Sequence, residues 1–264
     1  MRQAVSSPES LLRSGLKELS VSPSGEQVRL FLAYLTELKK WSRAYNLTSL
    51  KTDEDIVIKH FLDSLLYLKV LPQGKLRMLD VGSGAGFPGI PLKIIRSEIA
   101  LLLLEPSWKK ANFLRHIIRT LGLGPIEIIH KRIEELESMT VDVAVTRGLF
   151  TIQEFFEKAS PFVGEGGSLI LSKGPRVFQE IQAAKQDLLN YEGRSFTVPL
   201  TTMQRFIIRI VPNSLRLTVL SSDVPNACEK AITTSASICI NAECRLRKSG
   251  CRGFEGCPGF KARM

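Results

Sequence analysis

Glycine spacing gives this 264-residue chain its clearest chemical feature. Residues 78–91 read MLDVGSGAGFPGIP, in which an apolar run leads into Gly82 and Gly84, and a helix is expected to begin near Pro88. Glycines let a backbone turn tightly and come close to a ligand. A strand-to-helix loop at the carboxyl edge of a parallel sheet is where nucleotide-like ligands bind. The segment therefore predicts a site for such a ligand.

Two ligand classes fit this loop. Gly84, Gly86 and Gly89 satisfy the G-x-G-x-x-G spacing of dinucleotide-binding proteins, and Glu105 follows 19 residues after Gly86. The order D-V-G-S-G-A-G from Asp80 instead resembles the first motif of S-adenosylmethionine-dependent methyltransferases. The Asp80 carboxylate can meet the ammonium group of that donor, whereas it would repel the pyrophosphate of a nicotinamide cofactor. Glu105 can accept both ribose hydroxyls in either class. We expect the methyl donor, with a nicotinamide-dependent oxidoreductase as the alternative.

The surrounding pattern predicts the elements that position this loop. Apolar residues at steps of three and four over 26–45, and a second stretch opened by Asp53, predict helices, so we assign residues 1–72 to a helical cap. Short apolar runs then alternate with helical segments, which predicts a mostly parallel sheet with helices on both faces. We assign residues 73–213 to this ligand-binding domain and residues 214–264 to a basic tail. The predicted strands are 76–81, 99–104, 126–129, 141–145 and 168–171, then a closing hairpin of 194–198 and 205–211; the main predicted helices between them are 108–121 and 177–189.

Composition and charge narrow the class of protein. Hydrophobic residues make up 44% and charged residues 23% of the chain, which excludes a mostly disordered or fibrous protein. No apolar run approaches the ~18 residues of a membrane span, and the N-terminal sequence has no export signal, so we expect a soluble cytoplasmic protein. The net charge is +10, and residues 201–264 alone hold 10 basic and 4 acidic residues. This surplus favours nucleic acid as partner, although a basic surface that only aids solubility is an alternative.

All five cysteines lie in the last 37 residues. The rest of the chain therefore has neither a disulfide framework nor a cysteine nucleophile. Cys239, Cys244, Cys251 and Cys257 could supply four thiolates to zinc or an iron–sulfur cluster. No C-x-x-C pair is present, so we assign no metal ligands. A metal-bound module, a basic tail that grips RNA and an inert extension stay open.

The residues that are missing narrow the methyl acceptor. Methylation at C5 of a pyrimidine needs a cysteine nucleophile, which the body of this chain lacks. Enzymes that methylate exocyclic amines of bases usually carry Asn/Asp-Pro-Pro-Tyr/Phe after the fourth strand, where residues 146–150 read TRGLF. What remains is a nucleophile with a free lone pair, and N7 of guanine is one.

Several segments, in order, resemble one family: the bacterial small-subunit ribosomal RNA guanine-N7 methyltransferases, or glucose-inhibited division protein B family. The resemblance covers about residues 10–211 and is carried by WSRAYNLTSL (41–50), KHFLDSL (59–65), DVGSGAGFPGIPL (80–92), RIEEL (132–136), VTRGLF (145–150) and LSKG (171–174). It implies an α/β fold of the Rossmann-like class I methyltransferase type, with a mostly parallel seven-stranded sheet behind an N-terminal helical cap. It also implies S-adenosyl-L-methionine as cofactor, and 16S ribosomal RNA or the small ribosomal subunit as partner.

The resemblance also implies roles for particular residues. Gly82 and Phe87 would contact the donor, Ile133 and Glu134 would flank its adenine, and Arg147 would lie beside both the donor and the incoming base. The predicted donor-binding set is Asp80, Gly82, Gly84, Phe87, Glu105, Ile133, Glu134 and Arg147; Arg147 is also the predicted catalytic residue. Two departures from the family are Glu105, where Asp is common, and Arg147-Gly148-Leu149 in place of Arg-Ala-Phe.

Some roles stay open at this point. Arg147 could instead be a buried structural arginine, and Glu134 part of an ordinary solvated helix start. His60 is either a helix-packing residue or a contact to RNA or donor. Lys173 either meets a substrate phosphate or is solvated. An RNA-binding assembly protein with an inactive site is a further alternative to the enzyme.

Overall fold

The computed structural model describes residues 7–175, 177–183 and 191–212, and the pairs 238–239 and 260–261. The chain divides into two units, residues 1–214 and 215–264. In the second unit the described residues form two short strands, β8 (Ile238–Cys239) and β9 (Phe260–Lys261), which pair in antiparallel fashion. The predictions for the four tail cysteines depend on side chains outside the described residues.

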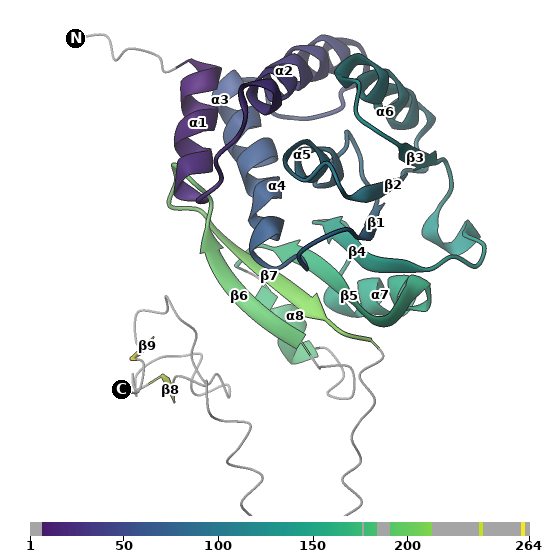
Figure 1. The fold of residues 1–264 in the computed structure, drawn as a ribbon. Coiled ribbons are helices and arrows are strands. Elements are labelled where there is room, and N and C mark those ends of the chain that lie inside the picture. Colours follow the sequence, from purple (N-terminus) through teal and green to yellow (C-terminus); the bar gives the residue numbers. More distant parts are fainter. Residues whose placement is uncertain (1–6, 176, 184–190, 213–237, 240–259, 262–264) are drawn as a thin grey trace, which may run out of the picture. The chain divides into compact units, whose positions relative to one another are not determined.

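A seven-stranded sheet forms the centre of the first unit (Figure 1). Its order is β3-β2-β1-β4-β5-β7-β6; β1 to β5 run parallel, and β7 is antiparallel to both β5 and β6. The predicted Rossmann-like class I methyltransferase fold is therefore confirmed. The order reverses between β1 and β4, and ligands of such sheets bind at the carboxyl ends of the strands at that point. The strands are β1 (Arg77–Val81), β2 (Ala100–Leu104), β3 (Ile126–Ile129), β4 (Val141–Arg147), β5 (Val163–Lys173), β6 (Tyr191–Thr197) and β7 (Gln204–Ile210).

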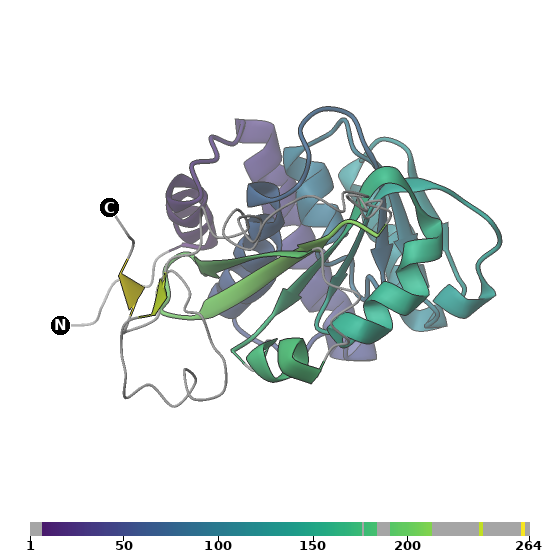
Figure 2. The same ribbon diagram turned by 90° about the horizontal axis from the view of Figure 1, so that it is seen from below.

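Helices cover both faces of the sheet, as Figures 1 and 2 show. Helices α1 to α6 share one hydrophobic cluster with alternate strand residues such as Met78 and Leu103, whereas α7 and α8 share another with Leu79 and Leu102. The predicted cap thus shares a core with the sheet. The helical elements are α1 (Pro8–Glu18), α2 (Gly25–Tyr45), α3 (Asp53–Ile56), the π-helix η1 (Val57–Leu62), α4 (Asp63–Leu65), the 3₁₀ helix η2 (Leu66–Lys69), α5 (Gly89–Ile95), α6 (Trp108–Leu121), the 3₁₀ helix η3 (Ile133–Glu135), α7 (Ile152–Ala159), the 3₁₀ helix η4 (Ser160–Phe162) and α8 (Val177–Ala183).

Local chemistry explains where the cap helices begin and end. Ser24 and Gln27 form a reciprocal capping box at the start of α2, and Asn46 in the left-handed conformation ends it. Thr52 caps the acidic start of α3. The predicted single helix from Asp53 continues through a π-helical turn, η1, which carries His60. Such turns are frequent at functional sites.

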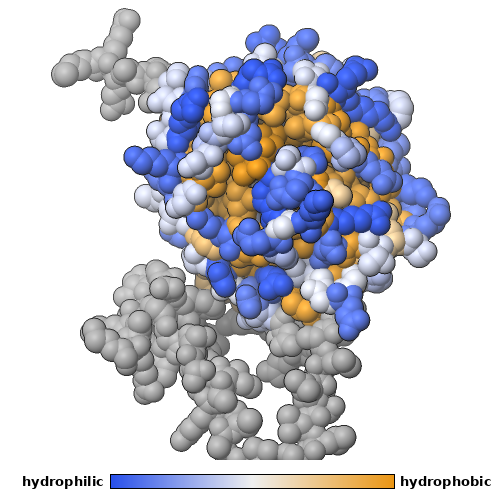
Figure 3. Space-filling view, viewed as in Figure 1, coloured by the Kyte–Doolittle hydropathy of each residue, from blue (hydrophilic) through white to orange (hydrophobic). Residues whose placement is uncertain are grey.

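Within the described residues, no helix is both long and apolar enough to cross a membrane. Figure 3 shows hydrophilic residues around the rim of the face seen in Figure 1 and a hydrophilic group near its centre, with hydrophobic residues between them. Three large hydrophobic side chains of the described residues are exposed: Tyr45, Trp108 and Leu149.

Candidate active site

The glycine loop follows β1 directly. Gly82 and Gly84 have φ angles of +70° and +60°, which residues with a side chain rarely adopt. The Gly82 amide donates to the Leu104 carbonyl at 2.9 Å and so ties the loop to the end of β2. A Cβ built on Gly84 would come within 4 Å of the Gly82 carbonyl oxygen alone, at 3.9 Å. The loop therefore leaves open space beside Gly84, as a ligand cradle requires, whereas the Leu149 side chain lies directly against Gly82.

Asp80, near the end of β1, is wholly buried. Its Oδ2 accepts from the Gly89 amide at 2.8 Å, whereas Oδ1 is buried without a partner. Burial raises the pKa of Asp80 to about 7, although the Gly89 hydrogen bond and the charge of Arg147 oppose this shift. Asp80 thus holds the start of α5 against β1, and its contact with the donor's ammonium group stays a prediction.

Glu105 follows β2 and is also buried. Its Oε2 accepts from the Gly84 amide at 2.8 Å, and its Oε1 accepts from the Ser107 amide at 2.8 Å. Each carboxylate oxygen has capacity for a further hydrogen bond. Glu105 therefore fixes the glycine loop relative to α6 and can still accept from the hydroxyls of a ribose.

A pocket of about 210 Å³ lies beside the loop. Ile133 is buried at the pocket, whereas the Glu134 side chain is 53% exposed and forms an ion pair with Lys158. The Lys158 hydrogen bond lowers the pKa of Glu134. An apolar wall with a charged rim suits a flat heterocycle such as adenine, and the cradle and Glu105 fit the rest of S-adenosylmethionine. The apolar wall comprises Val81, Gly82, Leu104, Ile133, Leu149 and Phe150, and the charged rim Lys131, Arg132 and Glu134.

Phe87, at the end of the loop, packs against the cap. Its ring stacks on His60, with centroids 4.4 Å apart and planes at 12°, and on Tyr34 at 5.4 Å. The guanidinium carbon of Arg147 lies 5.1 Å from the Phe87 ring centre. Phe87 therefore connects the glycine loop to both His60 and Arg147.

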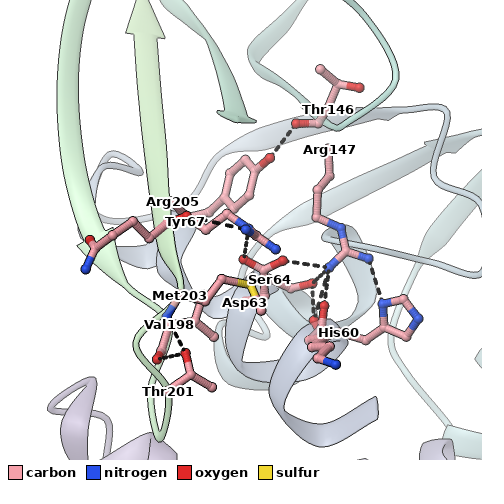
Figure 4. A network of polar contacts seen from close by, with 12 residues as sticks. His60, Asp63, Ser64, Tyr67, Thr146, Arg147, Val198, Thr201, Met203 and Arg205 are labelled. Atoms are coloured by element: carbon pink, nitrogen blue, oxygen red, sulfur yellow. Dashed lines mark hydrogen bonds and ion pairs between the residues drawn. The ribbon is translucent and has the colours of Figure 1, made fainter. Parts of the chain in front are cut away.

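Arg147, the last residue of β4, reaches into the cap (Figure 4). One terminal nitrogen donates to the carbonyls of Lys59 and His60 at 3.2 and 3.5 Å and to Ser64 Oγ at 3.4 Å, and the other lies 3.0 Å from His60 Nδ1. The side chain is 17% exposed. These contacts fix the guanidinium at the carboxyl edge of the sheet, close to the glycine loop.

Asp63 lies between two arginines from distant parts of the chain (Figure 4). Its carboxylate is 3.5 Å from Arg147 and 3.0 Å from Arg205 on β7, and its side chain is 4% exposed. Burial raises the pKa of Asp63, and the charges of Arg147 and Arg205 oppose this shift. The ionised carboxylate thereby links η1 and α4, β4 and β7 in one network.

His60 is neutral in this network. Arg147 can only donate, so Nδ1 of His60 accepts and Nε2 carries the proton toward Thr48 Oγ1, 2.7 Å away. Burial and the charge of Arg147 lower the pKa of His60 to about 3. Of the two roles left open, the structure shows a packed histidine that also positions Arg147.

Sequence reasoning missed part of this site and was wrong on Lys173. The Lys173 side chain is only 10% exposed and forms an ion pair with Glu180 at 2.7 Å, so it is neither solvated nor free for a phosphate. Asp63 lies in the motif KHFLDSL (59–65), which supports the family resemblance, but no role was predicted for it. Arg205 had no local signal, because its partner lies 142 residues away.

Comparisons with known proteins agree with this geometry. The family model described as "GidB: rRNA small subunit methyltransferase G" matches residues 27–208. Three similar curated proteins are all called ribosomal RNA small subunit methyltransferase G. The one from Geotalea uraniireducens is 38% identical over 75% of this chain and 94% of the relative; that from Chromobacterium violaceum is 34% identical over 76% and 96%; that from Caldanaerobacter subterraneus is 40% identical over 67% and 77%. The chain therefore belongs to the GidB family of rRNA small subunit methyltransferases.

Proposed function

We propose that the chain transfers a methyl group from S-adenosyl-L-methionine to N7 of a guanine in 16S ribosomal RNA. One observation carries this proposal: the glycine cradle, the ribose-accepting Glu105 and the fixed Arg147 all lie at the carboxyl edge of one parallel sheet. Membership of the GidB family gives the reaction class and the RNA.

The proposed donor site uses residues from three strand ends. Gly82 and Gly84 would lie along the donor, Glu105 would accept its ribose hydroxyls, and Ile133 with Glu134 would flank its adenine. Asp80 and Phe87 would complete the site from beneath and beside the loop. When bound, the sulfonium donor supplies an activated methyl group, so the task of the protein is to align donor and acceptor.

The proposed acceptor site is centred on Arg147. Guanine N7 has a free lone pair, so no residue need remove a proton before attack, and no cysteine nucleophile is needed. We assign to Arg147 a hydrogen bond to the guanine O6, a common arginine partner, which leaves the N7 lone pair free. The Phe87 ring and His60 Nδ1 both contact the guanidinium and fix its position.

The geometry gives no support to the nicotinamide alternative. A bound pyrophosphate needs free backbone amides at the glycine loop. The Gly84 amide already donates to Glu105, and that carboxylate would repel the phosphates. An inactive RNA-binding protein would keep this geometry, so only a measurement of methyl transfer can distinguish it from the enzyme.

We also propose three functional parts, with residues 1–72 as cap, 73–213 as donor-binding domain and 214–264 as a basic tail. The proposed substrate is ribosomal RNA, either naked or in the small subunit. Because ribosomal RNA is found in the cytoplasm, we propose that compartment for the protein.

The test is methyl transfer from labelled S-adenosylmethionine to RNA from cells that lack this protein, offered as naked 16S RNA and as small subunits. Labelled RNA from either form is expected. Donor binding without transfer to either form would support the inactive protein, and retention of NADH but not of the methyl donor would support the oxidoreductase.

A further inference from the structure

Trp108, the first residue of α6, exposes 61% of its surface although indole is costly to leave in water. The two other exposed large hydrophobic side chains of the described residues are Tyr45 and Leu149. Leu149 lines the donor pocket and Tyr45 packs on Trp41. Trp108 is therefore an exposed aromatic ring that the donor site does not explain.

Neighbours on two elements hold the indole in place. The guanidinium carbon of Arg115, two turns along α6, lies 5.3 Å from the Trp108 ring centre. The His130 ring, just after β3, lies 5.6 Å away at 58°. His130 Nε2 is 2.9 Å from the Pro106 carbonyl, so this nitrogen carries a proton and donates. An aromatic ring fixed in this way loses little freedom when a second ring stacks on it.

The position of Trp108 connects it to the reaction site. Glu105 accepts from the amides of both Gly84 and Ser107, so the residue before Trp108 is tied to the glycine loop. Pro106 lines the donor pocket. Trp108 thus lies beside the pocket on the β2–β3 side, whereas Arg147 lies at the end of β4.

The positive charge of the segment around Trp108 favours a polyanion as its partner. Residues 106–132 hold six Lys and Arg residues and a single acid, Glu127, which is half of the net charge of +10 in about a tenth of the chain. Lys109, Arg115 and Lys131 are exposed; Arg115 lies over the indole, and the two lysines directly follow Trp108 and His130 in the chain. Lys131 pairs with Glu137, whose side chain is 90% exposed, and such a surface pair is weak. Cations around a stacking ring are the arrangement with which proteins hold single-stranded RNA.

We propose that this surface, formed by Trp108, Lys109, Arg115, His130 and Lys131, binds an unpaired segment of the RNA substrate next to the methylated guanine. One base stacks on the indole, and the cations contact the flanking phosphates. The inference rests on the proposed function, since it names where the RNA of that reaction lies. It assigns Trp108 to RNA binding and not to donor binding.

The test compares the full-length wild type with Trp108→Ala, Trp108→Phe and Arg115→Ala, and with Arg13→Ala on α1 as a charge-matched control. Loss of base stacking is expected to weaken binding of a 16S RNA transcript about 5- to 100-fold in Trp108→Ala, with partial recovery in Trp108→Phe. Arg115→Ala is expected to reduce the slope of log affinity against log salt by about 0.7 to 0.9. Arg13→Ala should leave the affinity and the slope unchanged.

Tryptophan fluorescence gives a second measurement that does not need the alanine variant to fold. A short unstructured RNA should quench the wild type more than Trp108→Phe, in which Trp41 is the remaining tryptophan. S-adenosylmethionine affinity should be the same in all variants. Equal RNA affinity for wild type and Trp108→Phe, with equal quenching, would overturn the inference while methyl transfer by the wild type still upheld the proposed function. A wild type without donor binding or methyl transfer would instead overturn the proposed function.

Discussion

The two halves of the candidate site are built in different ways. The donor half uses backbone: the Gly82 amide meets Leu104, and Glu105 accepts from Gly84 and Ser107. The acceptor half uses side chains that meet across 83 to 142 residues of chain, from Arg147 to the cap and from Arg205 to Asp63. The donor half is thus a property of three neighbouring strand ends, whereas the acceptor half exists only when the cap is docked.

The charges of the two halves also differ. Two buried acids, Asp80 and Glu105, lie under and beside the loop, where a sulfonium would bind. On the acceptor side Arg147 and Arg205 share the single carboxylate of Asp63, and His60 is neutral. This difference implies that donor affinity and methyl transfer can be separated by mutation.

The largest effect is expected from Arg147→Ala. Removing the guanidinium that orients the guanine by a hydrogen bond should lower the rate of methyl transfer about 100- to 1,000-fold. The affinity for S-adenosylmethionine should change little. Arg147→Lys should not restore the rate, because a lysine cannot reach His60 Nδ1 and the Lys59 carbonyl together. Single-turnover transfer and donor calorimetry would measure both quantities. A parallel loss of donor affinity would show that the two halves are not separable.

Asp63→Asn should disrupt the acceptor half through stability. Two partly buried arginines would lose their common anion, which is expected to lower the free energy of unfolding by about 3 kcal/mol. The more accessible pair of Lys39 and Asp53, whose side chains are 36% and 38% exposed, supplies the control, because Asp53→Asn should cost less than about 1 kcal/mol. Urea unfolding would measure both variants, and equal small losses would show that the network is not structural.

Glu105→Gln should affect the donor half. The amide keeps one acceptor oxygen and loses the charge, so we expect S-adenosylmethionine to bind about 10- to 100-fold more weakly. Glu127→Gln, on the exposed side of β3, is the matched control and should bind the donor normally. Calorimetry would distinguish the two. Unchanged affinity in Glu105→Gln would remove Glu105 from the donor site.

The two halves should also respond to pH in opposite directions. The pKa of Asp80 rises to about 7 on folding, so its contribution to stability is present near pH 4 and is lost as the pH rises toward 7. The pKa of His60 falls to about 3, so its contribution is present above about pH 6.5 and is lost as the pH falls. Asp80→Asn should therefore gain stability relative to wild type as the pH rises from 4 to 7, by at most about 1.4 kcal/mol per pH unit. Urea unfolding across this range would contradict the burial argument if the two proteins kept a constant difference.

Glu134→Gln should have the smallest effect. Its side chain is half exposed and its ion pair with Lys158 is a surface pair, so donor affinity should change less than about threefold. Ile133→Ala, which opens the apolar wall of the pocket, should change the affinity for the donor more than Glu134→Gln does. The reverse order in calorimetry would assign the reading of the adenine edge to Glu134.

The sequence predicted the donor half well for a physical reason. A strand, a glycine loop and a helix follow each other directly in the chain, so residue order alone brings Asp80, Gly82 and Gly84 together. The sheet and helix α2 followed from apolar periodicity in the same way. Glu105 was also predictable, because it ends the next strand in the same layer.

The acceptor half was less accessible to sequence reasoning. The pairing of Asp63 with Arg205 depends on how the closing hairpin docks against the cap, which no periodicity encodes. Lys173 looked like a free cation at the sheet edge, but α8 places Glu180 beside it. Helix α1 lies within the predicted helical cap but was not predicted as a separate element, and α7 was not predicted. The break of the second cap helix at η1 depends on packing that the sequence pattern does not show.

The most direct test of the central claim maps the product of the reaction. RNA methylated by wild type, Arg147→Ala and Glu105→Gln would be cleaved by chemistry specific for N7-methylguanine. The account predicts one modified guanine with wild type, none with Arg147→Ala even at saturating donor, and recovery with Glu105→Gln when the donor concentration is raised. Modification at another atom, or recovery of Arg147→Ala by excess donor, would contradict it.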